Sequence, residues 1–217
     1  MPTYLDLESW PRRELFEFYR DFDKPYFNVC TRLDVTNLLQ ELQKHPGVSV
    51  SLTYHYFALK AANDIEQFRY RLRNGRVLIH EVINGGTTLM LPNETFTLVY
   101  FDYAETFAEF IGPAQQAVEE TKKDGAFRPR HEDDARIHCT TLPWIAFTSF
   151  SHARNWRRED SVPKMSFGKF IRENDRTVMP FSVEVHHALV DGLHVGRYIA
   201  RIEEMLAQPE IYLGNPR

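Results

Sequence analysis

The sequence holds little cysteine, no excess of basic charge and no long apolar run. Its two cysteines, Cys30 and Cys139, lie in apolar segments without a CxxC partner, so we expect buried free thiols and no disulfide. The net charge is −4, with acids and bases interspersed, which argues against a nucleic-acid or membrane-surface partner. No stretch approaches the roughly 18 apolar residues of a membrane span, and the N-terminus has no signal-peptide core. We therefore predict a cytoplasmic protein.

Internal repeats, low-complexity tracts and flexible linkers are also absent from the sequence. The 217 residues are 43% hydrophobic and 26% charged, which is typical of an ordinary globular protein. A chain of this length can remove roughly 70% of its unfolded surface from water, so it needs no disulfide or metal to fold. We predict a single domain over residues 1–217.

Apolar periodicity and turn residues predict strands and helices in mixed order. The Asn74-Gly75 pair predicts a hairpin turn, and Asp34 suits the cap of a helix that runs to Leu42. Further strands are expected at 3–7, 25–35, 95–103 and 178–190, and further helices at 52–63, 104–123 (interrupted near residues 112–113) and 196–207. These elements lack the regular rhythm of a doubly wound fold. We therefore predict an α/β protein of the α+β type, in which helices pack on a mixed sheet.

A first helix is expected close to the N-terminus. Ser9 suits its N-cap, and Pro11 falls in its first turn, where a missing N–H is harmless. Apolar side chains follow at the i, i+3, i+4, i+7 spacing of one helix face, namely Leu15, Phe18, Tyr19 and Phe22. We interpret this face as one that packs on the core, and we expect Leu15, Phe16 and Phe22 to be core residues.

The segment VEVHHALVDGLHVGRYI, residues 183–199, holds the residues that can carry chemistry. Apolar and polar side chains alternate up to the histidine pair, Asp191 and Gly192 then break the strand, and helical spacing resumes at Val195. The histidines therefore lie at a strand end that leads into a loop and a helix. Side chains at such a place can face a cleft while rigid neighbours hold them.

The residues alone leave three interpretations of the histidines open. They can be hydrogen-bonded structural residues at a strand end. They can ligate a metal, but we expect none, because the candidate ligands span a strand end, a turn and a helix start: His186, His187, Asp191 and His194. Finally, one histidine can be a general base, because the ordinary pKa of imidazole lies near neutral pH.

The segment HHALVDGLHVG closely resembles the HHxxxDG signature of the chloramphenicol acetyltransferases, and Arg197 falls at the signature's arginine. Five further segments resemble the family in order and approximate spacing: WPRRELFEFYR (10–20), FNVCTRLDVTNLL (27–39), the hairpin with the Asn74-Gly75 turn, LPWIAFTSF (142–150) and MPFSVEVHHALVDG (179–192). The resemblance covers most of the chain. It implies a two-layer sandwich that forms a homotrimer with active sites between subunits. It also implies acetylation of chloramphenicol, an antibiotic inactivation, with acetyl-CoA as co-substrate.

The resemblance assigns roles to individual residues. It implies that His187 takes the proton of the acceptor hydroxyl, whose oxygen attacks acetyl-CoA directly, without an acyl-enzyme. It implies that Asp191 forms a structural ion pair with Arg12. Thr140 falls at the family's serine that donates a hydrogen bond to the oxyanion of the tetrahedral intermediate, and Ser166 falls at a threonine beside it, where a hydroxyl can hold a water.

The resemblance also implies an aromatic acceptor pocket. Residues that fall at its lining are equally candidates for the core when taken singly: Phe18, Tyr19, Phe27 and Phe150. On the CoA side, Phe170 replaces a tyrosine that lies near the adenine in the family, so stacking is kept and the hydroxyl is lost. Ser51 falls where the family has another aromatic residue.

Two other functions stay open. The first is a same-fold acyltransferase that acts on another hydroxylated small molecule. The second is a non-catalytic trimeric binding protein, against which the retention of His187, Asp191 and Arg12 together argues. Two related classes fit less well by resemblance, since peptide-synthetase condensation domains are far longer, and dihydrolipoamide acyltransferase cores carry an aspartate where this chain has Val185.

Overall fold

The computed structural model describes residues 3–130, 133–155 and 159–214. Its helices are α1 (Arg13–Tyr19), α2 (Thr36–Leu42), α3 (Val50–Asp64), α4 (Phe107–Asp124), α5 (Gly192–Ala207) and α6 (Pro209–Leu213), with a 3₁₀ turn at Glu66–Arg69. Its strands are β1 (Thr3–Tyr4), β2 (Tyr26–Asp34), β3 (Tyr70–Arg73), β4 (Arg76–Ile79), β5 (Asn84–Met90), β6 (Phe96–Phe101), β7 (Arg136–Thr141), β8 (Lys164–Phe167), β9 (Ile171–Glu173) and β10 (Arg176–His186).

The main sheet has the order β2-β10-β8-β7-β5-β6, and β9 pairs with the start of β10. Strands β5, β7 and β8 run parallel, and the other pairs of this sheet are antiparallel. The predicted mixed sheet is therefore confirmed. A smaller sheet of order β1-β4-β3 contains the predicted hairpin, whose turn residues Asn74 and Gly75 take φ values of 52° and 70°. Positive φ at both positions is what a two-residue turn between twisted strands requires.

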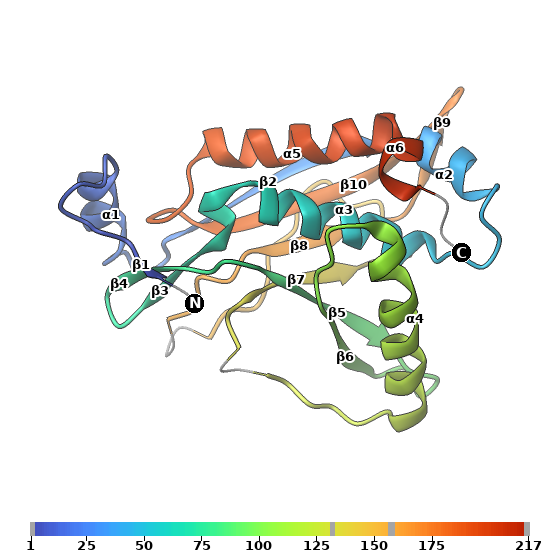
Figure 1. Cartoon of the computed structure of the whole chain (residues 1–217), viewed down its shortest axis with the longest axis horizontal. Helices are drawn as coiled ribbons and strands as arrows, with labels where there is room; N and C mark the ends of the chain where they lie inside the picture. Colours follow the sequence, from blue (N-terminus) through green and yellow to red (C-terminus); the bar gives the residue numbers. More distant parts are fainter. Residues whose placement is uncertain (1–2, 131–132, 156–158, 215–217) are drawn as a thin grey trace.

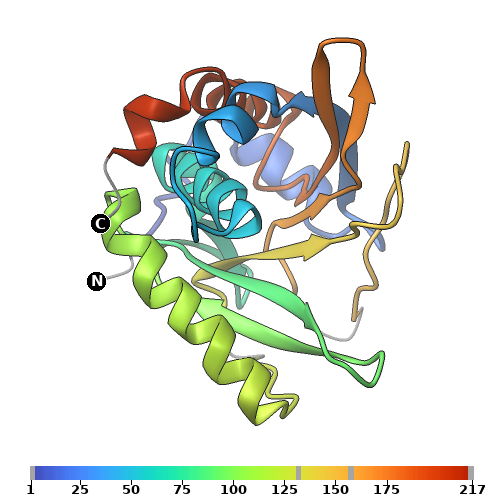
Figure 2. The same cartoon turned by 90° about the vertical axis from the view of Figure 1, so that its right-hand side faces the viewer.

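Helices α2, α3 and α5 lie along one face of the main sheet, and α4 lies beside β5 and β6 (Figures 1 and 2). The alternation of β10 directs its apolar side chains to these helices, so Phe181, Val183 and Val185 are fully buried. On α5, Tyr198 stacks on Phe68 with ring centroids 4.2 Å apart. On the opposite face of the sheet, His152 and Arg154 from the segment after β7 contact Ser166 of β8 (3.0 Å) and Glu184 of β10 (2.8 Å).

The first helix differs from the prediction. It begins at Arg13, and the hydroxyl of Ser9 donates to Asp6 (2.7 Å) instead of capping the helix. Phe16 is buried, but much of the expected core face is exposed, by 45% at Leu15, 61% at Phe18 and 46% at Phe22. The reason is that α1 lies at one end of the molecule (Figure 1), where Trp10 covers Phe16 and His187 covers Tyr19 but the side with Leu15, Phe18 and Phe22 stays exposed.

Helix α4 also differs, because it continues through Pro113 without an interruption. Its start is fixed by a capping box in which Thr106 and Glu109 bond each other's backbone N–H. Proline deprives the carbonyl of Glu109 of its helical partner, and both residues lie on the exposed side of the helix, where water can bind that carbonyl.

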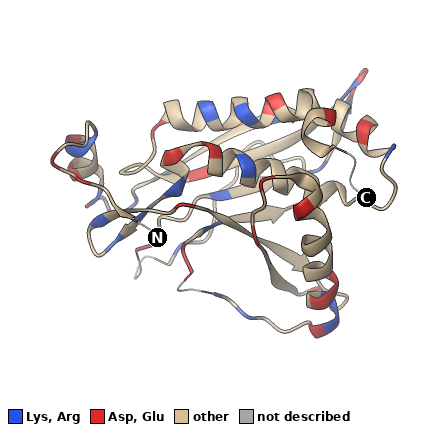
Figure 3. Cartoon of the chain, viewed as in Figure 1, with Lys and Arg blue, Asp and Glu red and all other residues tan. Residues whose placement is uncertain are grey.

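Basic and acidic side chains are interspersed along the helices and loops (Figure 3). Within the residues that the structure describes, no helix has the length and apolar character needed to cross a membrane.

Candidate active site

His187 is the first residue after β10. The strand's last register pair joins His186 to Tyr26 of β2, and the backbone N–H of His187 then donates to the carbonyl of Pro25 (2.7 Å). A turn follows, and α5 begins at Gly192 with Asp191 as its N-cap. The predicted position at a strand end, with rigid elements on both sides, is the one observed.

The imidazole of His187 lies between two aromatic rings. Tyr19 of α1 stacks on it with ring centroids 4.0 Å apart and planes within 10°, and Phe27 of β2 packs at 4.7 Å. The side chain is 31% exposed, so the ring is held without being enclosed. Its Nδ1 is buried and lies 3.5 Å from Asp191 Oδ1, too far for a good hydrogen bond. A proton on Nδ1, the nitrogen that faces this carboxylate, would leave the lone pair on Nε2.

Arg12 fixes the turn that carries His187. Its guanidinium makes a bidentate pair with Asp191 (2.7 and 2.6 Å) and donates to the carbonyls of Ala188 (2.9 Å) and His187 (3.2 Å). Burial of the Asp191 carboxyl would raise its pKa, but the hydrogen bond and charge of Arg12 outweigh burial and hold the pKa below its ordinary value. Asp191 is therefore an ionised partner of Arg12, as the family resemblance implies.

The two other histidines of the motif serve the backbone. Nδ1 of His194 accepts from the N–H of Asp191 (2.9 Å) and completes the cap of α5. Nδ1 of His186 accepts from the N–H of Ala188 (3.3 Å), and burial lowers the pKa of His186 to about 4. Both rings thus already use one nitrogen for structure.

Thr140 and Ser166 lie in the middle of the sheet, away from His187. The register places Thr140 beside Ser166, and Ser166 beside Ser182 of β10. His187 follows Ser182 by five residues, so the strand rise separates the two ends by roughly 16 Å. Within one chain, Thr140 and His187 therefore cannot act on the same ester group.

The predicted aromatic residues are likewise divided between the His187 end of the sheet and the Ser166 side. Tyr19 and Phe27 contact His187, whereas Phe18 packs on Tyr19 and Phe22 at the exposed side of α1. Phe150 lies with His152 (ring centroids 4.8 Å) on the segment that crosses the sheet. Ser166 is fully buried, and its hydroxyl is 3.0 Å from Nε2 of His152.

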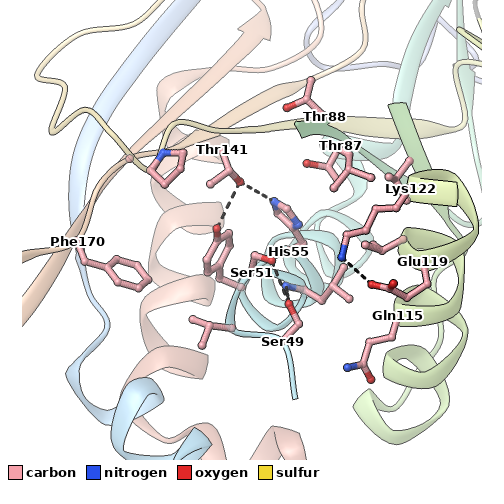
Figure 4. Close-up of a pocket in the computed structure, with 18 of the residues that line it drawn as sticks. Ser49, Ser51, His55, Thr87, Thr88, Gln115, Glu119, Lys122, Thr141 and Phe170 are labelled. Carbon is pink, nitrogen blue, oxygen red and sulfur yellow. Dashed lines mark hydrogen bonds and ion pairs between the residues drawn. The ribbon is translucent and has the colours of Figure 1, made fainter. Parts of the chain in front are cut away.

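A cavity of about 790 Å³ lies between α3, α4 and the sheet, and Figure 4 shows its lining. Ser49 and Ser51 at the start of α3 face Phe170 across it, while Glu119 and the ammonium of Lys122 form an ion pair (2.6 Å) on the α4 side. Phe170 is 38% exposed, so its ring is accessible to a ligand. The sequence prediction for Phe170 thus falls on a large cavity.

The inner end of this cavity is polar, which the sequence did not reveal. The hydroxyl of Thr141 lies 3.3 Å from both Tyr54 Oη and His55 Nε2. Burial lowers the pKa of His55 to about 3, so the imidazole is neutral. Adjacent residues of a strand point to opposite faces, so Thr141 lines this cavity while Thr140 faces the other side of the sheet.

Comparisons with known proteins agree over nearly the whole chain. The family model described as chloramphenicol acetyltransferase matches residues 2–203. The chain is 27% identical to a chloramphenicol acetyltransferase of Proteus mirabilis over 201 residues (92% of each chain) and 28% identical to chloramphenicol acetyltransferase 3 of Escherichia coli over 206 residues (94% and 96%). A solved chloramphenicol acetyltransferase structure matches with a TM-score of 0.84 and 28% identity, and 95% of this chain and 100% of that one are covered. The chain therefore belongs to the chloramphenicol acetyltransferase family and is an enzyme of that family.

Proposed function

We propose that this enzyme transfers the acetyl group of acetyl-CoA to a hydroxyl of chloramphenicol or of a similar hydroxylated small molecule, with His187 as general base. The observation that carries the proposal is the imidazole of His187, which is clamped between Tyr19 and Phe27 at a strand end and still 31% exposed. In the reaction, Nε2 takes the hydroxyl proton as the oxygen bonds to the thioester carbonyl. The imidazolium returns that proton to the sulfur when the C–S bond of the intermediate breaks.

Thr140 is proposed to stabilise the negative oxygen of the tetrahedral intermediate. Its hydroxyl has no hydrogen-bond partner among the described residues, so it is available to donate. One such donor is worth about 2.7–4 kcal/mol of transition-state stabilisation. The buried hydroxyl of Ser166 lies beside Thr140 on the neighbouring strand β8, where it could hold a water near the same negative oxygen.

The cavity between α3 and α4 is proposed to hold the CoA part of the donor. Phe170 offers a stacking surface for an aromatic base, and Lys169, which also lines the cavity, carries a charge that could bind a phosphate. The cavity reaches Thr141, whose neighbour Thr140 faces the other side of the sheet. Thr87 and Thr88 of β5 line the space on both sides of the sheet, so a thioester at the end of the arm could reach the proposed oxyanion donor beside them.

We further propose that the working enzyme is a homotrimer with active sites shared between copies. His187 lies roughly 16 Å along the strand direction from Ser182, the position of β10 that is level with Thr140, which is too far for one ester. The exposed apolar side chains of Leu15, Phe18 and Phe22 lie next to the His187 end, and Trp144 and Ile145 are 60% and 53% exposed beyond β7. Faces of this kind are suited to contacts between copies.

Thiol release from acetyl-CoA in the presence of chloramphenicol tests the reaction. The wild type should release thiol, and His187→Ala should lose a factor of about 10²–10⁴. Saturable chloramphenicol binding without thiol release, in both proteins, would instead identify a binding protein. Light scattering should give the mass of three 25.5 kDa chains.

Mixed trimers test the shared site. When differently tagged His187→Ala and Thr140→Val chains are co-expressed and the doubly tagged assembly is purified, some interfaces combine an intact His187 with an intact Thr140. Activity should return well above that of either pure variant. A mixed assembly as inactive as its parents would show that the two residues act within one chain or not together.

A further inference from the structure

The cavity between α3, α4 and the sheet contains a cluster of polar side chains at its inner end. The hydroxyl of Thr141, the last residue of β7, lies 3.3 Å from the hydroxyl of Tyr54 and 3.3 Å from Nε2 of His55 (Figure 4). Tyr54 and His55 are neighbours on α3, and all three side chains line the cavity. We refer to them as the Thr141 cluster. Polar groups in this position can bind a ligand that fills the cavity.

Each member of the Thr141 cluster is uncharged at neutral pH and carries one hydrogen that it can donate. Burial lowers the pKa of His55 to about 3, so its imidazole has a proton on only one nitrogen. Burial raises the pKa of Tyr54 to about 12, so its phenol keeps its proton. The hydroxyl of Thr141 keeps its proton as well. The cluster therefore holds one N–H and two O–H groups.

Burial also decides which nitrogen of His55 carries the proton. Nδ1 is buried and has no hydrogen-bond partner among the residues that the structure describes. The rings of Tyr54 and Phe167 pack against the imidazole, with centroids 5.0 and 5.2 Å away. A buried N–H without a partner is rarer in proteins than an acceptor that is not used. The proton of His55 therefore resides on Nε2, which donates it to Thr141.

The number of hydrogens in the cluster exceeds the number of contacts by one. Nε2 of His55 donates to Thr141, and a single hydrogen bond joins the hydroxyls of Thr141 and Tyr54, so one O–H has no acceptor within the cluster. Tyr54 is only 5% exposed, whereas Thr141 is partly exposed. The more buried hydroxyl, that of Tyr54, therefore donates to Thr141, because an unpaired hydroxyl costs most where water is excluded. The hydrogen of Thr141 is left to point into the cavity.

We propose that Thr141 is a positioning residue for the thioester donor, and that its hydroxyl donates to the carbonyl oxygen of the amide nearest the thiol of the pantetheine arm. The inference rests on the proposed acetyl transfer, in which this cavity holds the CoA part of the donor. Thr141 follows Thr140, the proposed oxyanion donor, directly in β7. A hydrogen bond at the amide would therefore hold the arm close to the place where the thioester reacts.

His55 and Tyr54 determine the kind of group that the cluster accepts. Both donate to Thr141, so its two lone pairs are occupied and only its O–H faces the ligand. A proton on Nδ1 of His55 would reverse this arrangement, because Thr141 would then donate to Nε2 and present a lone pair to the cavity. The observed burial of Nδ1 therefore predicts recognition of the amide carbonyl and not of the amide N–H.

Three truncated donors test the proposal with the full-length protein and chloramphenicol in the thiol-release assay. The thioacetate of N-acetylcysteamine keeps the amide, the thioacetate of 5-mercaptopentan-2-one keeps the carbonyl without the N–H, and S-pentyl thioacetate has neither. We expect kcat/KM for the amide and ketone donors to exceed that for the pentyl donor by about 10-fold, as one hydrogen bond predicts. A ketone donor no better than the pentyl donor would overturn the proposal.

The variant Thr141→Val removes the hydroxyl and keeps the shape of the side chain. It should lower kcat/KM for the amide and ketone donors by about 10-fold and leave that for the pentyl donor within about 3-fold. Damage to the strand or to Thr140 would instead lower all three values equally, and this outcome would contradict the assignment. The matched control is Thr177→Val in β10, outside the lining of the cavity, which should change none of the three.

The variant Tyr54→Phe shows which hydroxyl donates to the ligand. It should retain the preference for the amide and ketone donors over the pentyl donor, because Thr141 still accepts from His55 and its own hydrogen stays free. A preference that is lost in Tyr54→Phe and kept in Thr141→Val would overturn the role of Thr141.

Calorimetry with free CoA keeps the two proposals apart, because it needs no turnover. The Kd should rise about 10-fold in Thr141→Val and stay unchanged in Thr177→Val. This result, without thiol release from acetyl-CoA in the wild type, would retain the contact and refute the acetyl transfer. Thiol release in the wild type, with unchanged CoA affinity and donor preference in Thr141→Val, would retain the transfer and refute the contact. The variants are compared only where their circular dichroism spectra and melting curves match the wild type.

Discussion

Replacement of Arg12 by methionine removes four hydrogen bonds and a charge from the turn that carries His187. Two bonds join Arg12 to the Asp191 carboxylate and two join it to the carbonyls of His187 and Ala188. The exposed fraction of the side chain is 13% for Arg12 and 28% for Asp191, so water only partly replaces the lost partners. Breaking a fully buried pair costs about 3–5 kcal/mol. We therefore expect the free energy of unfolding to fall by about 2–4 kcal/mol.

That loss corresponds to a fall in Tm of roughly 4–16 °C for a domain of this size. Arg12→Lys should recover only part of it, because an ammonium cannot bond both carboxylate oxygens and both carbonyls in the plane of a guanidinium. Because the two carbonyls belong to the turn that carries the proposed base, kcat should fall more in Arg12→Met than in Arg12→Lys, while the Kd of free CoA stays unchanged. Urea denaturation and steady-state kinetics on the same samples measure both effects.

A double-mutant cycle of Arg12→Met with Asp191→Asn measures the coupling energy of the Arg12–Asp191 pair. The direction in which this coupling energy changes with pH follows from the pKa of Asp191. The pKa of Asp191 is depressed in the folded state, so its contribution is present above the unfolded value near 3.9 and is lost as the pH falls through the folded value. We expect a coupling energy of at least about 1.5 kcal/mol at pH 7 that shrinks toward pH 3. Additive effects at pH 7, or a coupling that grows in acid, would refute this account of the turn.

Three further predictions concern the oxyanion donor, the donor cavity and the buried histidines. Thr140→Val should lower kcat by about 10²–10³ while Thr140→Ser keeps most of it, as thiol-release kinetics would show. Phe170→Ala should raise KM for acetyl-CoA about 5–30-fold, at unchanged kcat, if its ring stacks on the base. Burial lowers the pKa of His55, His138, His152 and His186, so below pH 6.5 the unfolded chain takes up protons that the folded chain does not. Urea titrations should therefore show stability falling as the pH drops from 6.5, by at least about 1.4 kcal/mol per pH unit in total. Wild-type kcat in Thr140→Val, wild-type KM in Phe170→Ala or a stability that does not change with pH would contradict the corresponding prediction.

The features that local patterns predicted are those that depend on neighbouring residues. The alternation of β10 sends Phe181, Val183 and Val185 to the helices and carries the chain to His187 at its end. The Asn74-Gly75 turn needs positive φ at both residues, and the sequence offers the pair that tolerates it. The spacing of the histidine motif likewise indicated a strand, a turn and a helix, which is the observed order.

The features that local patterns missed depend on contacts between distant segments. Arg154, Lys164 and Glu184 carry charges that in a strand or loop would ordinarily face water. They are buried because the segment after β7 folds back across the open face of the sheet, a path that periodicity does not encode. For α1 the prediction was wrong in the opposite sense. Its apolar face was predicted to be buried, but no part of this chain covers Leu15, Phe18 and Phe22 among the described residues.

The same exposed face connects the proposed assembly to the chemistry. Tyr19 lies on α1 and stacks on His187, so the helix that presents unburied apolar residues also holds the base. A second copy that covers Leu15, Phe18 and Phe22 would bury that face and immobilise Tyr19 against the imidazole in one step. The row from Thr140 to Ser182 would then come from a different chain than the base. Burial of the helix face and completion of the site are thus the same event in the proposed trimer, which gives a physical reason for an isolated chain to be inactive.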